Sequence, residues 1–178
     1  KRENEWLKRV SYIDELTGVF NRNAYIDYCR SFTNDAVPGD FWVMITDING
    51  LKQVNDTKGH EAGDKLIMAT ADCLKRAVGT NGRIFRKGGD EFVSVVNADM
   101  ETFQSIIENL SPAGEKRPDA YNGEVCFSNG YVCSGEMDGT DFDEMVREAD
   151  RRMYENKKAF YRMHQNMDQR EKYRQISV

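Results

Sequence analysis

The sequence predicts an α/β or α+β sandwich, in which helices surround a small central sheet. Three observations lead to this prediction. A continuous apolar run over residues 41–45 is typical of a central strand that is buried on both faces. Strand-like residues 84–87 and 91–96 flank a glycine pair, which indicates a hairpin. Elsewhere, apolar residues recur every three to four positions, as they do in amphipathic helices.

The first half of the chain carries three helical patterns. Residues 1–13 are polar with a thin apolar seam, which fits either a coiled-coil heptad or a helix docked on its own domain. Asn21 is expected to cap a helix that runs from residue 22 to about 32. A further helix is expected over residues 61–77, because its leucines and small residues fall on one side.

The second half continues the alternation of strands and helices. Apolar residues from 103 to 110 predict an amphipathic helix. Two short strand-like segments follow at residues 125–128 and 131–133. A long last helix carries an apolar stripe from residue 142 to residue 153. The tail from residue 163 is polar, and we expect it to be helical or frayed.

Composition restricts the function of the chain. With 178 residues it suits one domain plus flanking segments, and its net charge of −5 argues against a nucleic-acid partner. Four cysteines without a CxxC pair, and only two histidines, argue against zinc and favour free thiols in a cytoplasmic protein. The chain opens at Lys1, so we expect an attached sensor or signalling domain, or a membrane tether, to lie outside it.

A first polar cluster follows the apolar run. Asp47 stands at its end, where a buried strand holds a carboxylate rigidly at the rim of the sheet. Gly50 allows a ligand to approach the backbone closely, and Lys52 supplies a positive charge for phosphate. The plainer alternative is that Asp47 caps a turn.

A second cluster lies at the predicted hairpin. Gly88 and Gly89 leave room for a bulky anion, and Asp90 and Glu91 follow them directly. If the hairpin lies beside the apolar strand, Asp90 can meet Asp47, and a divalent cation would relieve the repulsion between them. Oxygen ligands next to a triphosphate suit Mg²⁺. The alternative is that the glycine pair forms an ordinary hairpin turn.

A third cluster, residues 55–64, offers Asn55 and Asp64 near the start of a helix. A carboxylate can accept hydrogen bonds from N1–H and N2–H₂ of guanine, and an asparagine can contact the same base. Adenine lacks this pair of donors. The alternative is that both residues are helix caps.

Together these clusters resemble the GGDEF family. Residues 88–92 spell the motif that names it, and residues 14–22 are similar to its opening D-x-L-T-G-L-x-N-R. Residues 47–64 resemble its block D-x-D-x-F-K-x-x-N-D-x-x-G-H-x-x-G-D. Residues 128–130 and 149–157 resemble its late S-x-G strand and its A-D-x-A-L-Y-x-A-K helix. The resemblance divides the chain into a linker or signalling helix over 1–13, a GGDEF domain over 14–162 and a polar tail over 163–178.

The resemblance implies a palm-like fold shared with class III nucleotidyl cyclases, with a central, mostly antiparallel sheet surrounded by helices. It implies a diguanylate cyclase, which condenses two GTP molecules into cyclic di-GMP and two pyrophosphates with Mg²⁺, or Mn²⁺ as the alternative. Because each domain would hold one GTP, a homodimer is part of the implied mechanism. The runner-up function is a non-catalytic GTP-binding or protein-interaction module that regulates an attached domain.

The matching positions imply the following residue roles. Glu91 would bind a second metal ion or activate the 3′-hydroxyl, and it would be catalytic together with Asp90 and Lys52. The metal ligands would be Asp47, the Ile48 carbonyl, Asp90 and Glu91. The GTP contacts would be Gly50, Leu51, Lys52, Asn55, Asp64, Gly88, Gly89 and Lys157, with Asn55 and Asp64 reading guanine.

The chain departs from the family pattern in three places. Residues 79–82 stand where many relatives carry the R-x-x-D of a product-inhibition site, so we expect no such site. Asn49 and Gly50 replace the second Asp and the Phe of the strand-end block, which removes no expected side-chain ligand. The usual G-R-N after the last-helix lysine is replaced by residues 160–162, which changes one expected phosphate contact and leaves Arg162 as its candidate substitute.

Overall fold

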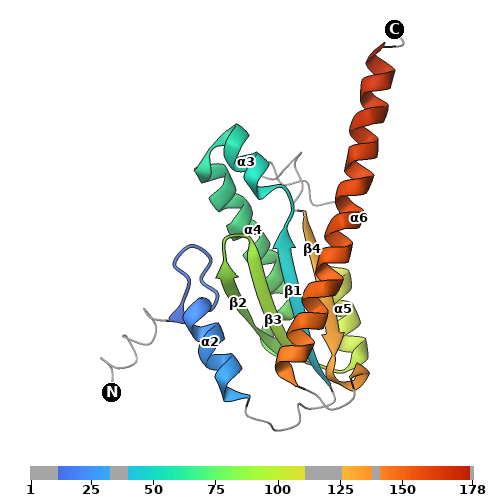
Figure 1. Cartoon of the computed structure of the whole chain (residues 1–178). Helices are drawn as coiled ribbons and strands as arrows, with labels where there is room; N and C mark the ends of the chain where they lie inside the picture. Colours follow the sequence, from blue (N-terminus) through green and yellow to red (C-terminus); the bar gives the residue numbers. More distant parts are fainter. Residues whose placement is uncertain (1–11, 33–39, 111–125, 138–140, 177–178) are drawn as a thin grey trace.

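The chain folds as one four-stranded antiparallel sheet with helices on both faces (Figure 1). The computed structural model describes residues 12–32, 40–110, 126–137 and 141–176, without the side chains of 164–176. The predicted antiparallel sheet with surrounding helices is therefore confirmed. The strand order is β2-β3-β1-β4, so β1 is central. The bounds of the strands are β1 Phe41–Ile48, β2 Gly82–Gly88, β3 Glu91–Asn97 and β4 Phe127–Cys133.

The helices form two layers around the sheet. Helices α4 and α5 cover one face, while α2 and the first part of α6 cover the other (Figure 1). The short helix α3 lies beyond the end of β1, at the same end of the sheet as the β2–β3 turn. The bounds of the helices are α2 Arg22–Ser31, α3 Leu51–Lys58, α4 His60–Val78, α5 Met100–Leu110 and α6 Phe142–Ile176.

Strand β1 is buried on both faces, as its apolar run predicts. Trp42 and Met44 pack toward α4 and α5, and Trp42 stacks on Phe103 at 3.9 Å between ring centroids. Val43 and Ile45 alternate with them and pack toward α2 and α6. The strand thus joins the two cores, and this burial holds its last residues in place at one end of the sheet.

Several predicted elements have slightly different bounds in the structure. Asn21 caps α2 as expected, since its side chain accepts a hydrogen bond from the Ala24 amide at 3.1 Å. The two strand-like segments of the second half are one continuous strand, β4, because Asn129 and Gly130 stay paired with β1. The predicted segment 1–13 lies almost wholly outside the described residues. Helix α6 continues past residue 163 to Ile176.

Two helix predictions need correction. Asn55 was expected near the start of one helix, but it lies within a separate helix, α3, which no sequence pattern predicted. The alternative that Asn55 and Asp64 are caps is wrong, because the N-cap residues of α3 and α4 are Gly50 and Gly59.

Among the described residues, no helix combines the length and apolar character needed to cross a membrane.

Candidate functional site

The site is built where β1 meets the β2–β3 hairpin. The register of β1 and β3 places Asp47 opposite Glu91, and the Ile48 amide donates to the Asp90 carbonyl at 3.2 Å. The condition under which Asp47 and Asp90 could meet, that the first strand and the hairpin are neighbours, is therefore met. The hairpin turns at Gly89, whose φ of 49° is readily adopted only by glycine. Three carboxylates, those of Asp47, Asp90 and Glu91, thus gather at one end of the sheet.

Asp47 is the most constrained of these carboxylates. Burial raises its pKa, the hydrogen bond from Lys157 opposes that rise, and the charges of Asp90 and Glu91 add to it. Lys157 reaches Asp47 from α6 and forms an ion pair with it, and only 15% of the Asp47 side chain is exposed. The pKa of Lys157 is raised, because its bond to Asp47 outweighs the opposing effect of burial. The Asp47–Lys157 pair therefore lies close to two further carboxylates, those of Asp90 and Glu91.

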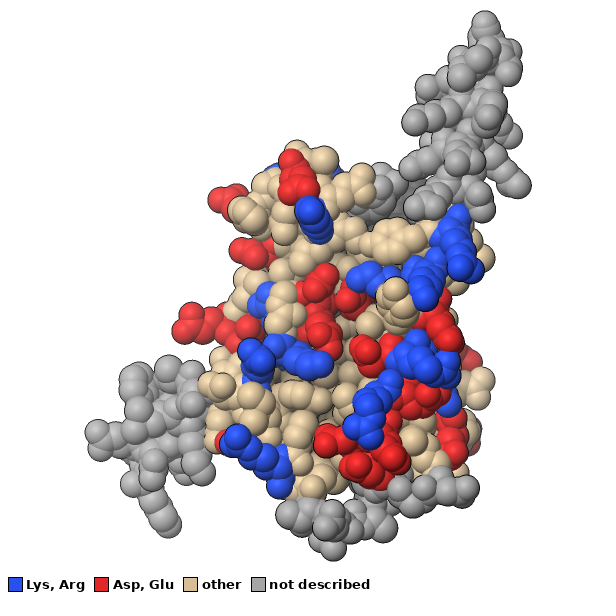
Figure 2. Space-filling model, viewed as in Figure 1, with Lys and Arg blue, Asp and Glu red and all other residues tan. Residues whose placement is uncertain are grey.

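Glu91 faces a different partner. The Lys87 ammonium lies 2.9 Å from a carboxylate oxygen of Glu91, across the hairpin. Within the described part of the chain, the Asp90 side chain has no hydrogen bond or ion pair. Figure 2 shows acidic and basic side chains side by side across the middle of this face. Asp90 and Glu91 thus differ in their surroundings, because Asp90 lies in the hairpin turn and Glu91 begins β3.

The N-terminus of α3 adds hydrogen-bond donors to this cluster. Gly50 is its N-cap residue, with φ of 74°, and no side chain caps the helix there. Among the described residues, the backbone amides of Leu51, Lys52 and Gln53 have no acceptor. Unpaired amides at a helix start attract anions. The Lys52 side chain is exposed and makes no ion pair with any described residue, so it adds an uncompensated positive charge.

A cleft of about 410 Å³ lies between β1, α3 and α6. It brings together six residues predicted from the sequence, and Asp47 borders it through its ion pair with the cleft residue Lys157. It also contains three residues that were not predicted: Gln53, Asp56 and Tyr161. The cleft is lined by Ile48, Gly50, Leu51, Lys52, Gln53, Asp56, Asp90, Lys157 and Tyr161.

Tyr161 bridges two elements of the cleft. Its hydroxyl accepts a hydrogen bond from the Gly50 amide at 3.1 Å, so it occupies one donor at the start of α3. The sequence signal that could have found it is its position, four residues after Lys157 on one helix, which places both on the same face. Arg162, the candidate substitute for the missing phosphate contact, is exposed and does not line the cleft.

The structure separates the predicted base-reading residues from the cleft. Asn55 on α3 is half-buried, and Asp64 on α4 is exposed. Neither lines the cleft, and the same holds for Gly88 and Gly89 at the hairpin. The packing of α3 against α4 at Gly59 brings Asn55 next to Gly63, one residue before Asp64. These residues lie on the α3–α4 pair, and the cleft lies on its β1 and α6 side.

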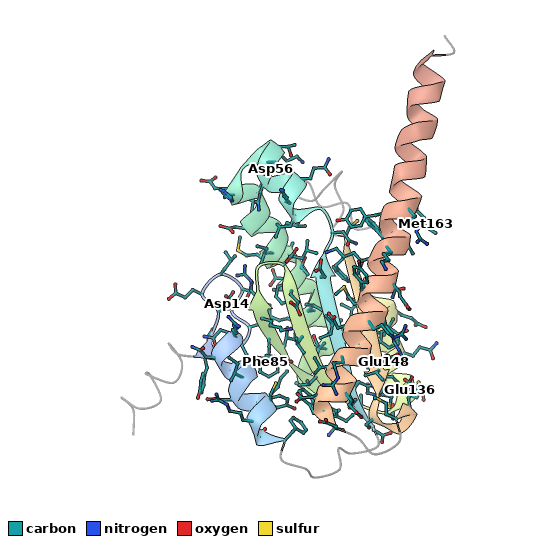
Figure 3. All side chains as sticks on the ribbon, in the orientation of Figure 1. Asp14, Asp56, Phe85, Glu136, Glu148 and Met163 are labelled. Carbon is teal, nitrogen blue, oxygen red and sulfur yellow. The ribbon has the colours of Figure 1, made fainter. Side chains whose placement is uncertain are left out.

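The opening segment holds the hairpin through one ion pair. Asp14 accepts from the Thr17 amide at 3.0 Å and from Arg86 at 3.1 Å, and Figure 3 shows it in the loop before α2. Arg86 also donates to the Gly89 carbonyl at 2.9 Å through its Nη2. The guanidinium therefore ties the turn of the hairpin to the start of the domain. The opening segment is thus joined to the hairpin by direct side-chain contacts.

This clamp predicts a pH dependence of stability. Burial acts to raise the pKa of Asp14, but its hydrogen bonds to Thr17 and Arg86 prevail and hold the pKa below its ordinary value. A carboxyl group whose pKa is lowered in the folded state stabilises the fold at pH values above its unfolded-state pKa. This contribution is lost as the pH falls through the folded-state pKa. We expect Asp14→Asn to cost roughly 1.5–3 kcal/mol at pH 7, which is typical of hydrogen bonds to a charged group.

The measurement is urea unfolding of both chains between pH 7 and pH 3. The difference in unfolding free energy between the wild type and Asp14→Asn should shrink as the pH falls below about 4, where an unfolded aspartate protonates. Asp72→Asn is the control, because it removes an exposed carboxylate that, among the described residues, pairs with Lys75 alone. A difference that stays constant over this range would contradict the clamp.

The donor set suits a metal that is completed by a substrate. Among the described residues, no three acidic, histidine or cysteine side chains are arranged to enclose a metal ion. Asp47 and Asp90 supply two hard carboxylates near an open cleft. Mg²⁺ is commonly bound by one or two carboxylates together with substrate phosphates. The residues present therefore fit such an ion, provided that an anionic ligand supplies the remaining oxygens.

The fold and the three carboxylates at one end of the sheet point to a class of protein. The antiparallel sheet and its two helix layers match those of solved GGDEF domains, which have the palm-like cyclase fold. The chain belongs to the GGDEF family, because the model described as "Diguanylate cyclase, GGDEF domain" matches residues 11–162. The resemblance seen in the sequence is thereby confirmed.

Curated relatives carry related names. The chain is 30% identical over 158 residues to the probable diguanylate cyclase DgcT of Escherichia coli K12, covering 85% of this chain and 35% of that protein. It is 25% identical to the diguanylate cyclase DgcS of Shewanella oneidensis, covering 85% of this chain and 51% of that protein. It is 30% identical to the signaling protein YkoW of Bacillus subtilis, covering 91% of this chain and 21% of that protein. The chain thus spans about half of these relatives or less.

Solved structures agree in fold. The coiled coil and GGDEF domain of DgcB from Caulobacter crescentus, in complex with c-di-GMP, superposes with a TM-score of 0.71 at 22% identity. That match covers 89% of this chain and 86% of the other. A structure describing the interaction of a microbial GGDEF domain with bis-(3,5)-cyclic di-GMP matches with a TM-score of 0.67 at 30% identity, covering 83% and 94%.

Proposed function

We propose that the chain is a diguanylate cyclase domain that joins two GTP molecules into cyclic di-GMP. The observation that carries the proposal is the gathering of Asp47, Asp90 and Glu91 beside the open amides of α3. This arrangement places acidic groups next to donors for an anion, as a metal-bound triphosphate requires. The diguanylate cyclase names of the relatives support the same reading.

The metal would be Mg²⁺, with Mn²⁺ as the alternative, held by Asp47, Asp90 and the Ile48 carbonyl. When bound, it would neutralise phosphate charge and stabilise the leaving pyrophosphate. Burial raises the pKa of Asp47, and the charges of Asp90 and Glu91 raise it further, so the cluster carries a repulsion that a divalent cation would relieve. Glu91 would bind a second ion or accept the proton of the attacking 3′-hydroxyl, after leaving Lys87.

Two parts of the domain would contact the nucleotide, one at its phosphates and the other at its base. The amides of Gly50 and Leu51, together with Lys52, would hold the phosphates, and Lys157 would turn from Asp47 to the phosphates when a metal takes its place. Gly88 and Gly89 would leave space beside them. Asn55 and Asp64 would contact guanine on the α3–α4 pair. The attacking 3′-hydroxyl belongs to the other GTP, so two domains must face each other in a homodimer.

The test is product formation by a dimer. A parallel dimeric coiled coil is fused before Lys1, and the fused chain is incubated with GTP and Mg²⁺. The nucleotides are then separated and identified by mass spectrometry. We expect cyclic di-GMP and pyrophosphate from GTP, and no product from ATP. Tight GTP binding without product in the fused dimer would refute the cyclase and favour the non-catalytic GTP-binding module.

The hydrogen bond between Gly50 and Tyr161 predicts that removal of the tyrosine hydroxyl changes the affinity for GTP. The Gly50 amide has a single proton, so the Tyr161 hydroxyl and a phosphate oxygen compete for it. Tyr161→Phe removes the competitor, and we expect GTP to bind about 5-fold more tightly, the scale of one net hydrogen bond. The measurement is calorimetric titration with GTP and Ca²⁺. Tyr154→Phe, on the same helix, 55% exposed and away from the cleft, is the control. Weaker binding would mean that the hydroxyl donates to the phosphate.

A further inference from the structure

Gly63 lies in α4, directly under the side chain of Asn55 on α3. A Cβ added at Gly63 would lie 1.9 Å from Asn55 Oδ1, 2.9 Å from its Cγ and 3.3 Å from its Nδ2. Any side chain at this position would therefore collide with the whole carboxamide group. Gly63 is itself buried, and the backbone fixes the position of a Cβ, so an alanine methyl group could not avoid this contact unless Asn55 moved.

The backbone of α4 does not require glycine at this position. Gly63 is absent from the positive-φ glycines of the described chain and sits inside a regular helix, where alanine is a better helix former. Gly59 provides the contrast, because its φ of 84° needs glycine and an added Cβ there would meet nothing. The glycine at 63 thus gives up helix stability, and the atoms nearest to the space it leaves are those of the Asn55 carboxamide.

The Asn55 carboxamide is held by packing rather than by hydrogen bonds. Its backbone carbonyl accepts from the Gly59 amide at 2.9 Å, but its side chain makes no hydrogen bond within the described part of the chain. The residue is nevertheless half-buried. A partly buried amide group without a partner retains its donors and acceptor for a ligand. The contact with Gly63 therefore sets the direction in which the donors and the acceptor of the Asn55 carboxamide point.

We propose that Gly63 is a positioning residue, which holds Asn55 in the orientation that contacts guanine and so contributes to the choice of guanine over adenine. This inference rests on the proposed function, in which Asn55 reads the base. An alanine at position 63 must push the carboxamide to another rotamer, while α4 keeps its fold. Gly63 thus acts through Asn55 and touches no ligand itself.

The experiment is a double-mutant cycle of Gly63→Ala and Asn55→Ala. The probe is α,β-methylene GTP with Mg²⁺, which cannot release pyrophosphate, so its binding is measured by calorimetry without turnover. We expect Gly63→Ala to weaken binding about 10-fold, and Asn55→Ala to weaken it by a similar factor. In the Asn55→Ala background, Gly63→Ala should cost nothing further, because the group it displaces is gone. The preference over α,β-methylene ATP should shrink in both single variants.

Thermal unfolding separates positioning from damage to the fold. In the Asn55→Ala background, Gly63→Ala should keep or raise the melting temperature, since alanine favours the helix. Equal 10-fold losses in both backgrounds, or no loss in either, would overturn the positioning role. If Asn55→Ala alone leaves affinity unchanged, the base contact fails and this inference fails with it. A wild-type chain that does not bind the GTP analogue refutes the proposed function as well.

Discussion

Asp90→Ala should abolish cyclic di-GMP formation by the fused dimer, lowering the rate about 1,000-fold or more. Removal of one group that stabilises charge in a transition state commonly costs 10²–10³ in rate, and Asp90 is also proposed to hold the metal. The measurement is initial rate of pyrophosphate release at saturating GTP and Mg²⁺. Unchanged activity would mean that the metal lies elsewhere and that the hairpin carboxylates have another role.

The same variant should keep its fold. The Asp90 side chain makes no hydrogen bond or ion pair with any described residue, and its structural bond uses the backbone carbonyl, which accepts from Ile48. Its charge raises the pKa of Asp47, so its removal relieves repulsion in the ligand-free chain. We therefore expect a melting temperature equal to the wild type or slightly higher. Asp72→Ala on α4 is the control for both rate and stability.

Gly130→Ala should destabilise the domain by about 3 kcal/mol, the upper part of the usual range for overpacking a core. An added Cβ would lie 2.1 Å from both the Ala149 carbonyl oxygen and the Met153 amide nitrogen. Both neighbours are helix backbone, so neither can rotate away as a flexible side chain would. Helix α6 must move off β4, and with it Lys157. For a chain of this size the melting temperature should fall by roughly 6–12 °C.

Gly88→Ala is the matched control for this measurement of stability. Gly88 also lies in a strand, its φ is not positive, and an added Cβ would meet nothing within 4 Å. It should melt within about 1 °C of the wild type, as harmless surface substitutions do. Equal melting temperatures for Gly130→Ala and Gly88→Ala would contradict the close approach of α6 to β4. The late S-x-G motif would then need an explanation other than packing.

Helix α3 shows why one element escaped prediction. Only Leu51 and Val54 are buried along its eight residues, so it has a single apolar contact pair and no stripe that repeats. Its caps are Gly50 and Gly59, which form no side-chain cap, and so the usual serine, threonine or aspartate signal is missing. By contrast, α4 spans 19 residues and buries one side throughout, which makes its periodicity visible.

Local patterns predicted the features that depend on neighbours in the chain. The hairpin around Gly89, the Asn21 cap and the buried strand β1 all follow from backbone preferences and side-chain alternation over a few residues. The motif over 88–92 identified the family for the same reason, since its residues are contiguous. The proximity of Asp47 to the hairpin could be predicted only on a condition, because local sequence patterns do not indicate which strands are neighbours.

The sequence by itself determined the family, the antiparallel α/β architecture and the set of candidate residues. The tertiary structure decided their partners. Lys157 and Asp47 are 110 positions apart, and Tyr161 and Gly50 are 111 apart, so no local pattern pairs them. The close approach of Asn55 to Gly63 likewise depends on how closely α3 packs on α4. Such contacts are set by packing across the core, which brings distant segments to fixed distances that local backbone preference does not encode.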